Sequence, residues 1–207
     1  MCIIVSQFDI DSLILVKMQS MEEENSSATT SNQPGSENLL KLSASSISDY
    51  ETCPYKYRLK HIDKVPERKT RATMEFGIII HNVLDEFHGS KNQGLDNLLQ
   101  LLDKHWRTDA FEYLLREKEF KLQAQELLKA YHQYIQDHHP QVVARERKFS
   151  FTIAELQVMI SGKIDRIDQE GDCLAVVDYK TSKNKEKAKG RLQLALYTEA
   201  LKRDAVE

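Results

Sequence analysis

Asp165, Asp178 and Lys180 stand among the apolar residues of the stretch GKIDRIDQEGDCLAVVDYKTS near the end of the chain. The two apolar runs around QEGD predict a β-hairpin. With a two-residue loop at Glu170–Gly171, Asp165 is expected to oppose Val176. Side chains alternate between the faces of a strand, so Asp178 and Lys180 share a face with Val176 and therefore with Asp165. The hairpin is thus predicted to bring two carboxylates and one amine together.

Two carboxylates on one patch favour a bound cation, because neighbouring like charges are costly to keep ionised. Oxygen ligands of this kind select Mg²⁺ or Mn²⁺, which retain waters and recruit phosphate oxygens. We expect Asp165 and Asp178 to bind the metal, with the main-chain carbonyl of Tyr179 as a further ligand. Lys180 would position the attacking water or offset negative charge on a phosphate. A simple strand-end ion pair between Asp178 and Lys180 is the alternative.

Three further side chains stand at positions that fit such a site. His81 lies on a predicted helix and offers an imidazole ligand, although a single histidine on such a helix is more often structural. Gln193 and Tyr197 are four residues apart on a predicted closing helix, so they share one of its faces. We expect them to support the site or to contact nucleic acid.

Two basic runs accompany these residues, although the formal net charge of the whole chain is -3. The first is YKYRLKHIDKVPERKTRA, and the second is KTSKNKEKAKGR, directly before the closing helix. Lys and Arg side chains displace counterions from a phosphate backbone, so both runs fit DNA, whereas a merely solvated loop is the alternative. The second run supplies the candidate DNA contacts Lys183, Lys185, Lys187, Lys189 and Arg191.

The 207 residues divide into three parts by composition. Residues 1–18 form a short apolar segment of unknown role, and residues 19–39 form an acidic and polar linker that is expected to be disordered. Residues 40–207 have the composition of one folded domain. No apolar run reaches the roughly 18 residues of a membrane-spanning helix. The three cysteines show no metal-binding spacing and favour a reducing, cytoplasmic setting.

Within the domain the hydrophobic period changes from helical to strand-like. We expect a short helix capped by Ser46 with Asp49 three residues later, a second helix opened by Pro54, and a third ended by Gly89. A helical insertion at about residues 90–140 follows. Three strands (ARERKFSFTI, LQVMISGKIDRID and CLAVVDYKT) and the helix GRLQLALYTEALKR complete the order. This order predicts an α/β fold with a largely antiparallel start of a mixed sheet.

Five motifs, in this order along the chain, resemble those of the RecB-type nucleases of the PD-(D/E)XK superfamily. This group includes the nuclease domains of RecB and AddB and the CRISPR-associated spacer-acquisition exonucleases. The stretch LSASSISDYETCPYKYRLKHI resembles the family's opening LSxSxIxxYxxCPxxY signature, and FGIIIHNVLDEF resembles its GxxxH helix. GKIDRID resembles the motif of the first metal-binding Asp, VVDYKT the D-x-K motif, and QLALY the Q-x-x-x-Y motif. The resemblance covers roughly Leu40 to Arg203.

The resemblance implies that His81, Asp165 and Asp178 are metal ligands, that Lys180 is catalytic, and that Gln193 and Tyr197 support the site or the DNA. It also implies a restriction-endonuclease-like core that cuts phosphodiester bonds and leaves 5′-phosphates. That core contains a strand after the last helix, and the sequence shows none there. The chain is therefore expected to be a fragment, a shortened variant, or a protein that completes its sheet in another way.

Some relatives hold an iron–sulfur cluster with one cysteine of the CPxxY signature and three more beyond the Q-x-x-x-Y helix. Cys53 matches the first of these positions, but no cysteine follows Cys173 in this chain. An iron–sulfur cluster is therefore not expected, and Cys53 fits a buried small apolar residue.

The sequence thus predicts a Mg²⁺- or Mn²⁺-dependent DNA nuclease, of exonuclease type, acting in DNA repair or recombination with a helicase in cis or in trans. A non-catalytic DNA-binding or scaffold module of a helicase–nuclease complex is the alternative, because a fold can outlast its active site. A metal-dependent phosphatase would share the acids without needing two basic runs. The presence of all four residues, His81, Asp165, Asp178 and Lys180, favours the nuclease.

Overall fold

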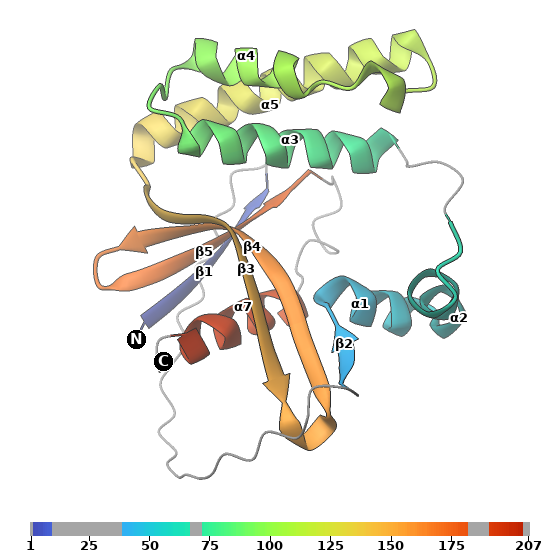
Figure 1. Ribbon diagram of the computed structural model, residues 1–207. Helices are drawn as coiled ribbons and strands as arrows, with labels where there is room; N and C mark the ends of the chain where they lie inside the picture. Colours follow the sequence, from blue (N-terminus) through green and yellow to red (C-terminus); the bar gives the residue numbers. More distant parts are fainter. Residues whose placement is uncertain (1, 10–38, 67–71, 182–190, 205–207) are drawn as a thin grey trace.

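The computed structural model describes residues 2–9, 39–66, 72–181 and 191–204. Over these residues the chain forms a five-stranded mixed sheet with helices on both of its faces (Figure 1). The α/β architecture predicted from the sequence, with its antiparallel start, is confirmed. The order of elements within the domain, helices before three long strands and a closing helix after them, is also as expected.

Three long strands form the centre of the sheet: β3 (Gln141–Ile153), β4 (Val158–Glu170) and β5 (Cys173–Lys180). β4 pairs antiparallel with β3 along one side and with β5 along the other. The short strand β2 (Leu40–Leu42), which the sequence analysis did not predict, pairs in parallel with the start of β4. Since helices cover both faces of the sheet, the run from Ile164 to Asp168 of the central strand β4 is buried throughout.

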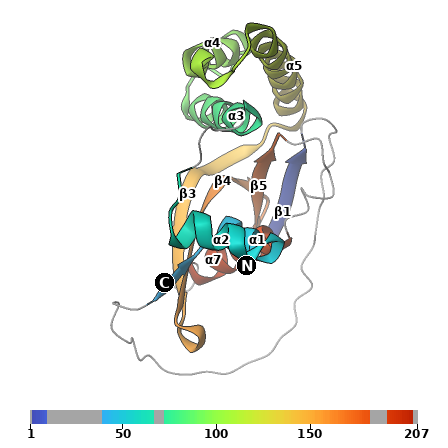
Figure 2. The ribbon, with the colours of Figure 1, turned by 90° about the vertical axis from the view of Figure 1, so that its right-hand side faces the viewer.

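An N-terminal strand, β1 (Cys2–Asp9), forms the edge of the sheet beyond β5. It runs parallel to β5, with the backbone of Cys2 beside Cys173 and that of Asp9 beside Lys180. Figure 2 shows the two strands side by side. The first apolar segment of the chain therefore has a place in the sheet, which the sequence analysis left open. Among the described residues, β1 is thus the parallel neighbour of β5 in the sheet.

The hairpin between β4 and β5 turns one residue later than predicted. Glu170 pairs with Cys173, so the turn consists of Gly171–Asp172, and Gly171 has a φ of 59° that suits glycine. Val176 opposes Ile167, and Arg166 opposes Val177 at the end of the ladder, so Asp165 and Asp178 each follow this last pair. The predicted pairing of Asp165 with Val176 is therefore wrong. The register differs by two residues, which preserves the face, so the two acids still lie on one side.

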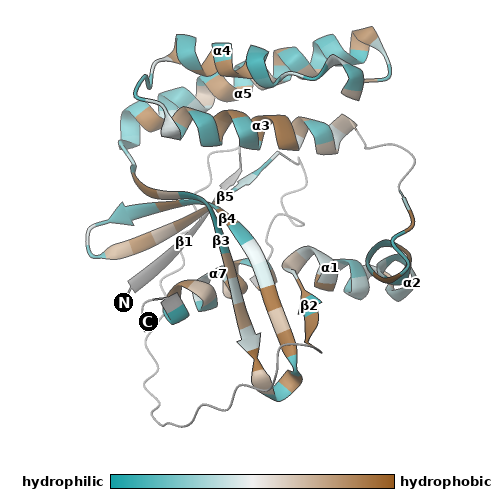
Figure 3. Cartoon of the chain, in the orientation of Figure 1, coloured by the Kyte–Doolittle hydropathy of each residue, from teal (hydrophilic) through white to brown (hydrophobic). Residues whose placement is uncertain are grey.

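A layer of three long helices covers one face of the sheet (Figure 1). These helices are α3 (Ala72–Gly89), α4 (Leu95–His105) and α5 (Leu114–His138), with the short turns of η2 (Thr108–Ala110) between α4 and α5. α3 ends at Gly89 as predicted. Figure 3 shows the apolar side of α3, and its predicted apolar positions are all buried in a cluster that also takes Val177 and Tyr179 from β5: Ile79, Ile80, Val83, Leu84 and Phe87.

The opposite face of the sheet is covered by α7 (Arg191–Asp204). Tyr197 and Leu201 of this helix pack with Ile167 of β4 and Val176 of β5 in a second buried cluster. The alternation of β5 therefore sends Val176 toward α7 and Val177 toward the helical layer. A one-turn helix, η3 (Ala154–Leu156), connects β3 to β4.

Short helices at the start of the domain lie beside the sheet: α1 (Ala44–Thr52), α2 (Pro54–Tyr57) and η1 (Arg58–Ile62). The N-cap of α1 is Ser43, whose side chain accepts from the N–H of Ser46 in a capping box. The prediction that Ser46 caps the helix is therefore wrong by three residues. Pro54 opens α2 as expected.

Cys53 is a free thiol, whereas Cys173 takes part in a disulfide bond. The reducing, cytoplasmic setting that the sequence indicates stays a prediction. Within the described part of the chain, none of the helices combines the length and the apolar character that a membrane crossing requires.

Candidate active site

The end of β5 carries an acid and a lysine that α7 holds together. Asp178 Oδ2 lies 2.7 Å from the Nζ of Lys180. Gln193 Nε2 donates to Asp178 Oδ1 at 3.0 Å, and Gln193 Oε1 accepts from Lys180 Nζ at 3.1 Å. The Gln193 amide also donates to the hydroxyl of Tyr197 at 2.5 Å. One side chain of α7 thus fixes both the acid and the amine, and the predicted shared face of Gln193 and Tyr197 is confirmed.

A second group of contacts joins β4, β5 and α3. Asp165 Oδ2 accepts from the main-chain N–H of Tyr179 at 2.9 Å. His81 Nδ1 lies 3.4 Å from Asp165 Oδ1, and His81 Nε2 donates to the carbonyl of Tyr179 at 3.0 Å. The main chain of Tyr179 therefore contacts two of the predicted metal ligands. Its carbonyl, a predicted ligand itself, is bound to His81 in this structure.

Glu146 joins this second group, and sequence reasoning missed it. Ligand atoms of His81, Glu146 and Asp165 all lie within 4.8 Å of one another, from α3, β3 and β4. One imidazole nitrogen and carboxylate oxygens form a donor set that suits Mg²⁺ or Mn²⁺. Both oxygens of Asp178 are bound instead by Gln193 and Lys180. Glu146 would have been recognisable only from the pairing of β3 with β4, which the sequence does not state.

Burial makes the two aspartates respond differently. Burial raises the pKa of Asp178 to about 6, against the lowering effect of Lys180 and with the help of nearby Asp165. Burial also disfavours the charged form of Asp165, but its contact with His81 outweighs this and lowers the pKa of Asp165. For His81 burial lowers the pKa, and the contact with Asp165 more than reverses this. Extra positive charge thus stabilises the site, which fits a divalent cation.

A cleft of about 750 Å³ opens from Lys180 and Gln193 toward the start of α1. Its walls come from α1, β3, β4, β5 and α7, and they combine hydroxyl groups, apolar side chains, the carboxylate of Glu51 and the amines of Lys163 and Lys180. Gly162 leaves room for the ring of Phe149, because a Cβ at this position would lie 2.6 Å from that ring. The lining residues include Ser43, Ser45, Ser48, Ser161, Leu192 and Leu196.

The candidate DNA contacts have a mixed outcome. Lys183, Lys185, Lys187 and Lys189 lie outside the described residues, and Arg191 is the first residue of α7. The other basic run is organised around an acid: Asp49 lies 2.6 Å from Lys56, 3.1 Å from Lys60 and 3.0 Å from His61. The hydrogen bond from Lys56 is the main cause that holds the pKa of Asp49 far below its usual range. Part of this basic run is therefore already paired with an acid of the same segment.

The family model described as the PD-(D/E)XK nuclease superfamily matches residues 41–207 of the chain. The matched span contains every side chain of the two groups of contacts. No curated protein matches the chain.

Proposed function

Because the chain belongs to the PD-(D/E)XK nuclease superfamily, we propose that it is a RecB-type nuclease that hydrolyses DNA phosphodiester bonds with Mg²⁺ or Mn²⁺. The observation that carries the proposal is the convergence of Asp178, Lys180 and Gln193 beside Asp165 and His81. An isolated strand-end ion pair would not need the additional bridge from α7. The superfamily implies a divalent metal and a nucleic-acid substrate, and the donor groups of the site fit both.

In this proposal Asp165, Asp178 and His81 hold the metal, with the carbonyl of Tyr179 as a further ligand. The bound metal would lower the pKa of a water and offset charge that grows on the phosphate. Lys180 faces the same carboxylate and is kept in place by Gln193, so its amine can orient the water or neutralise a phosphate oxygen. Gln193 and Tyr197 act by holding this pair.

Two observations favour DNA over a small phosphate ester. The cleft beside the site extends past Lys163 to the serines of α1, which is longer than one phosphate requires. The basic run that ends at Arg191 leads directly into α7, the helix that carries Gln193, and remains a proposed DNA contact. A phosphatase that acts on small phosphate esters would need neither feature.

Exonuclease action, a role in DNA repair or recombination, and a helicase partner rest on the resemblance of the five motifs to RecB-type nucleases. Linear and covalently closed circular single-stranded DNA of the same sequence separate the modes of cleavage. An exonuclease degrades the linear form and leaves the circle intact, whereas cutting of both forms at similar rates contradicts the exonuclease assignment. Rapid hydrolysis of p-nitrophenyl phosphate, with no cutting of either DNA, would favour the phosphatase.

The scaffold alternative predicts a different pattern in the same assay. A scaffold module binds both DNA forms, with affinity that falls as salt rises, and cleaves neither of them. The full set of ligands and the bridged lysine favour the enzyme over this alternative, because a non-catalytic module has no need to retain them.

A further inference from the structure

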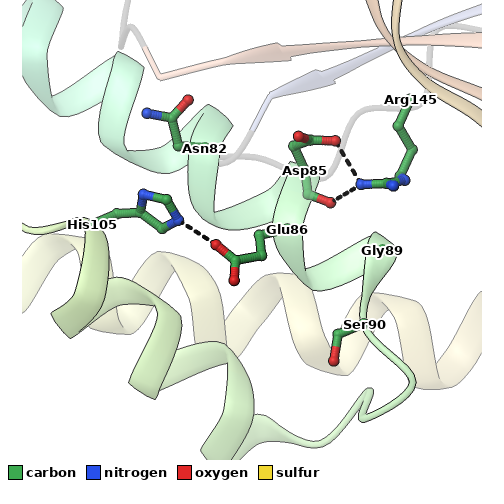
Figure 4. Close-up of a pocket in the computed structure, with 7 residues that line it drawn as sticks. All are labelled: Asn82, Asp85, Glu86, Gly89, Ser90, His105 and Arg145. Atoms are coloured by element: carbon green, nitrogen blue, oxygen red, sulfur yellow. Dashed lines mark hydrogen bonds and ion pairs between the residues drawn. The ribbon is translucent and has the colours of Figure 1, made fainter.

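Arg145 of β3 and Asp85 of α3 form an ion pair that clamps the two elements together (Figure 4). One guanidinium nitrogen of Arg145 donates to Asp85 Oδ1 at 2.7 Å and to the main-chain carbonyl of Asp85 at 2.5 Å. Asp85 lies about one helical turn after His81 on α3, and Arg145 directly precedes Glu146 on β3. The clamp therefore ties together the two elements that carry His81 and Glu146.

The surroundings of the clamp favour this one pairing. A Cβ on Gly89 would lie 2.7 to 2.8 Å from the guanidinium of Arg145, so glycine leaves the space that the arginine occupies. Glu86, the acid next to Asp85, is bound by His105 at 2.7 Å and by Lys104 at 2.5 Å. Figure 4 shows Glu86 directed toward His105 and Asp85 directed toward Arg145, on the wall of a polar hollow of about 530 Å³.

The backbone at Glu146 needs such support. Glu146 has a φ of 47°, in the left-handed region that a residue with a side chain rarely adopts. Conformations of this kind are unfavourable and persist only where the surroundings enforce them. The neighbours of Glu146 are pinned, since Arg145 pairs with Arg166 and Arg147 with Ile164 across the β3–β4 ladder. The carboxylate itself forms an ion pair with Lys163.

We infer that the Asp85–Arg145 clamp positions Glu146 as a ligand of the metal site, so that Arg145 is a positioning residue for metal binding. The inference rests on the proposed function in one respect, because the metal ion that Glu146 would bind is the ion that serves catalysis. The clamp fixes the distance between α3 and β3, and the left-handed backbone at Glu146 turns its carboxylate toward His81 and Asp165. Without the clamp, Glu146 can relax to ordinary strand geometry, which directs its side chain elsewhere.

Binding of Mn²⁺ to the full-length chain, followed by the electron paramagnetic resonance signal of free Mn²⁺, tests this without any substrate. We expect Arg145→Gln and Glu146→Gln each to weaken Mn²⁺ affinity by about tenfold, the lower end of the range for residues that orient metal ligands. The double variant should bind as weakly as Glu146→Gln alone, because Arg145 acts through Glu146. The matched control is Lys148→Gln, which removes one positive charge from an exposed position of β3 and should leave the affinity unchanged.

Several outcomes overturn the inference. Mn²⁺ affinity within twofold of the wild type for Arg145→Gln would do so, as would losses that multiply in the double variant. If Arg145→Gln does not fold, Asp85→Asn breaks the same clamp from α3 and must show the same tenfold loss. A wild type that binds Mn²⁺ but never cuts DNA contradicts the nuclease proposal and does not affect the clamp inference. If the wild type cuts DNA and the clamp variants keep full Mn²⁺ affinity, only the clamp inference fails. A wild type that binds no Mn²⁺ contradicts both the clamp inference and the nuclease proposal.

Discussion

Tyr179 and Asp165 are joined by a 2.9 Å hydrogen bond from the main-chain N–H of the tyrosine to the carboxylate. The phenol of the same tyrosine points the other way, into the helical layer, where it lies 3.1 Å from the hydroxyl of Tyr131. Arg166, 1% exposed, donates to that phenol at 3.3 Å and to Asp168 at 2.8 Å. A buried polar network on one side of β5 therefore supports the main chain that orients candidate ligands on the other.

Replacing Arg166 by Met should destabilise the domain strongly. The change leaves Asp168, which is 4% exposed, as a buried charge without its guanidinium partner. Losses of about 3–5 kcal/mol are typical when one member of a buried ion pair is removed. Urea denaturation followed by circular dichroism measures the loss. The double variant Arg166→Met, Asp168→Leu should recover part of the stability, and a single variant as stable as the wild type would contradict the importance of the network.

Stability should fall with decreasing pH because of His88, which adjoins this network. Burial lowers the pKa of His88 to about 3, and nearby Arg166 adds to the effect. His88 accepts from Arg166 at 3.1 Å and so is neutral in the folded state. The unfolded chain binds a proton on this histidine below about pH 6.5 while the folded chain does not, so stability is lost as pH falls from about 6.5 toward 3.

The expected slope from this one group approaches ~1.4 kcal/mol per pH unit. Denaturant unfolding between pH 7 and 5 checks it, with His88→Gln as the comparison. The variant should show a shallower loss of stability over this range. Equal slopes for the two proteins would show that His88 is not held neutral.

Gln193→Ala should impair cleavage more than it impairs folding. The variant frees both Asp178 and Lys180 from their shared partner on α7 but removes a half-buried side chain of modest size. We expect kcat to fall by about 10- to 100-fold, as for other residues that orient a metal site, with a small change in melting temperature. Lys202→Ala, an exposed change on the same helix, is the control. Unchanged kcat in Gln193→Ala would mean that the bridge has no catalytic role.

Asp49→Asn should loosen the short helices at the start of the domain. The change places a neutral amide among Lys56, Lys60 and His61. Because Asp49 is only 8% exposed, water cannot easily replace the lost carboxylate. Hydrogen exchange of residues 44–62 should accelerate while exchange in α3 stays as in the wild type. Equal exchange rates for residues 44–62 in the variant and the wild type would show that the Asp49 cluster contributes little to the stability of this region.

Local periodicity accounts for what could be predicted about the site. Alternation along one strand placed Asp178 and Lys180 together, and helical spacing placed Gln193 beside Tyr197. Glu146 could not be predicted, because its place depends on the pairing of β3 with β4 and on a positive φ that no local motif signals. The turn at Gly171–Asp172 shifted the opposing residues but preserved the face, so the grouping survived an incorrect register.

The fold shows the same division between local and long-range information. The amphipathic pattern of α3 and its end at Gly89 were readable from the sequence. The pairing of β1 with β5 joins segments that are more than 160 residues apart, and no periodicity within either segment specifies it.

Cleavage of end-labelled single-stranded and duplex DNA by the purified chain tests the nuclease assignment most directly. Reactions with Mg²⁺, Mn²⁺ or EDTA are run for the wild type, Asp178→Asn, Lys180→Ala and the control Asp172→Asn, an exposed acid in the turn of the same hairpin. We expect metal-dependent cutting by the wild type and by Asp172→Asn, and a loss of at least about 100-fold in the two site variants. A folded wild type that binds DNA without cutting it, or an Asp178→Asn variant that cuts as fast as the wild type, would contradict the account.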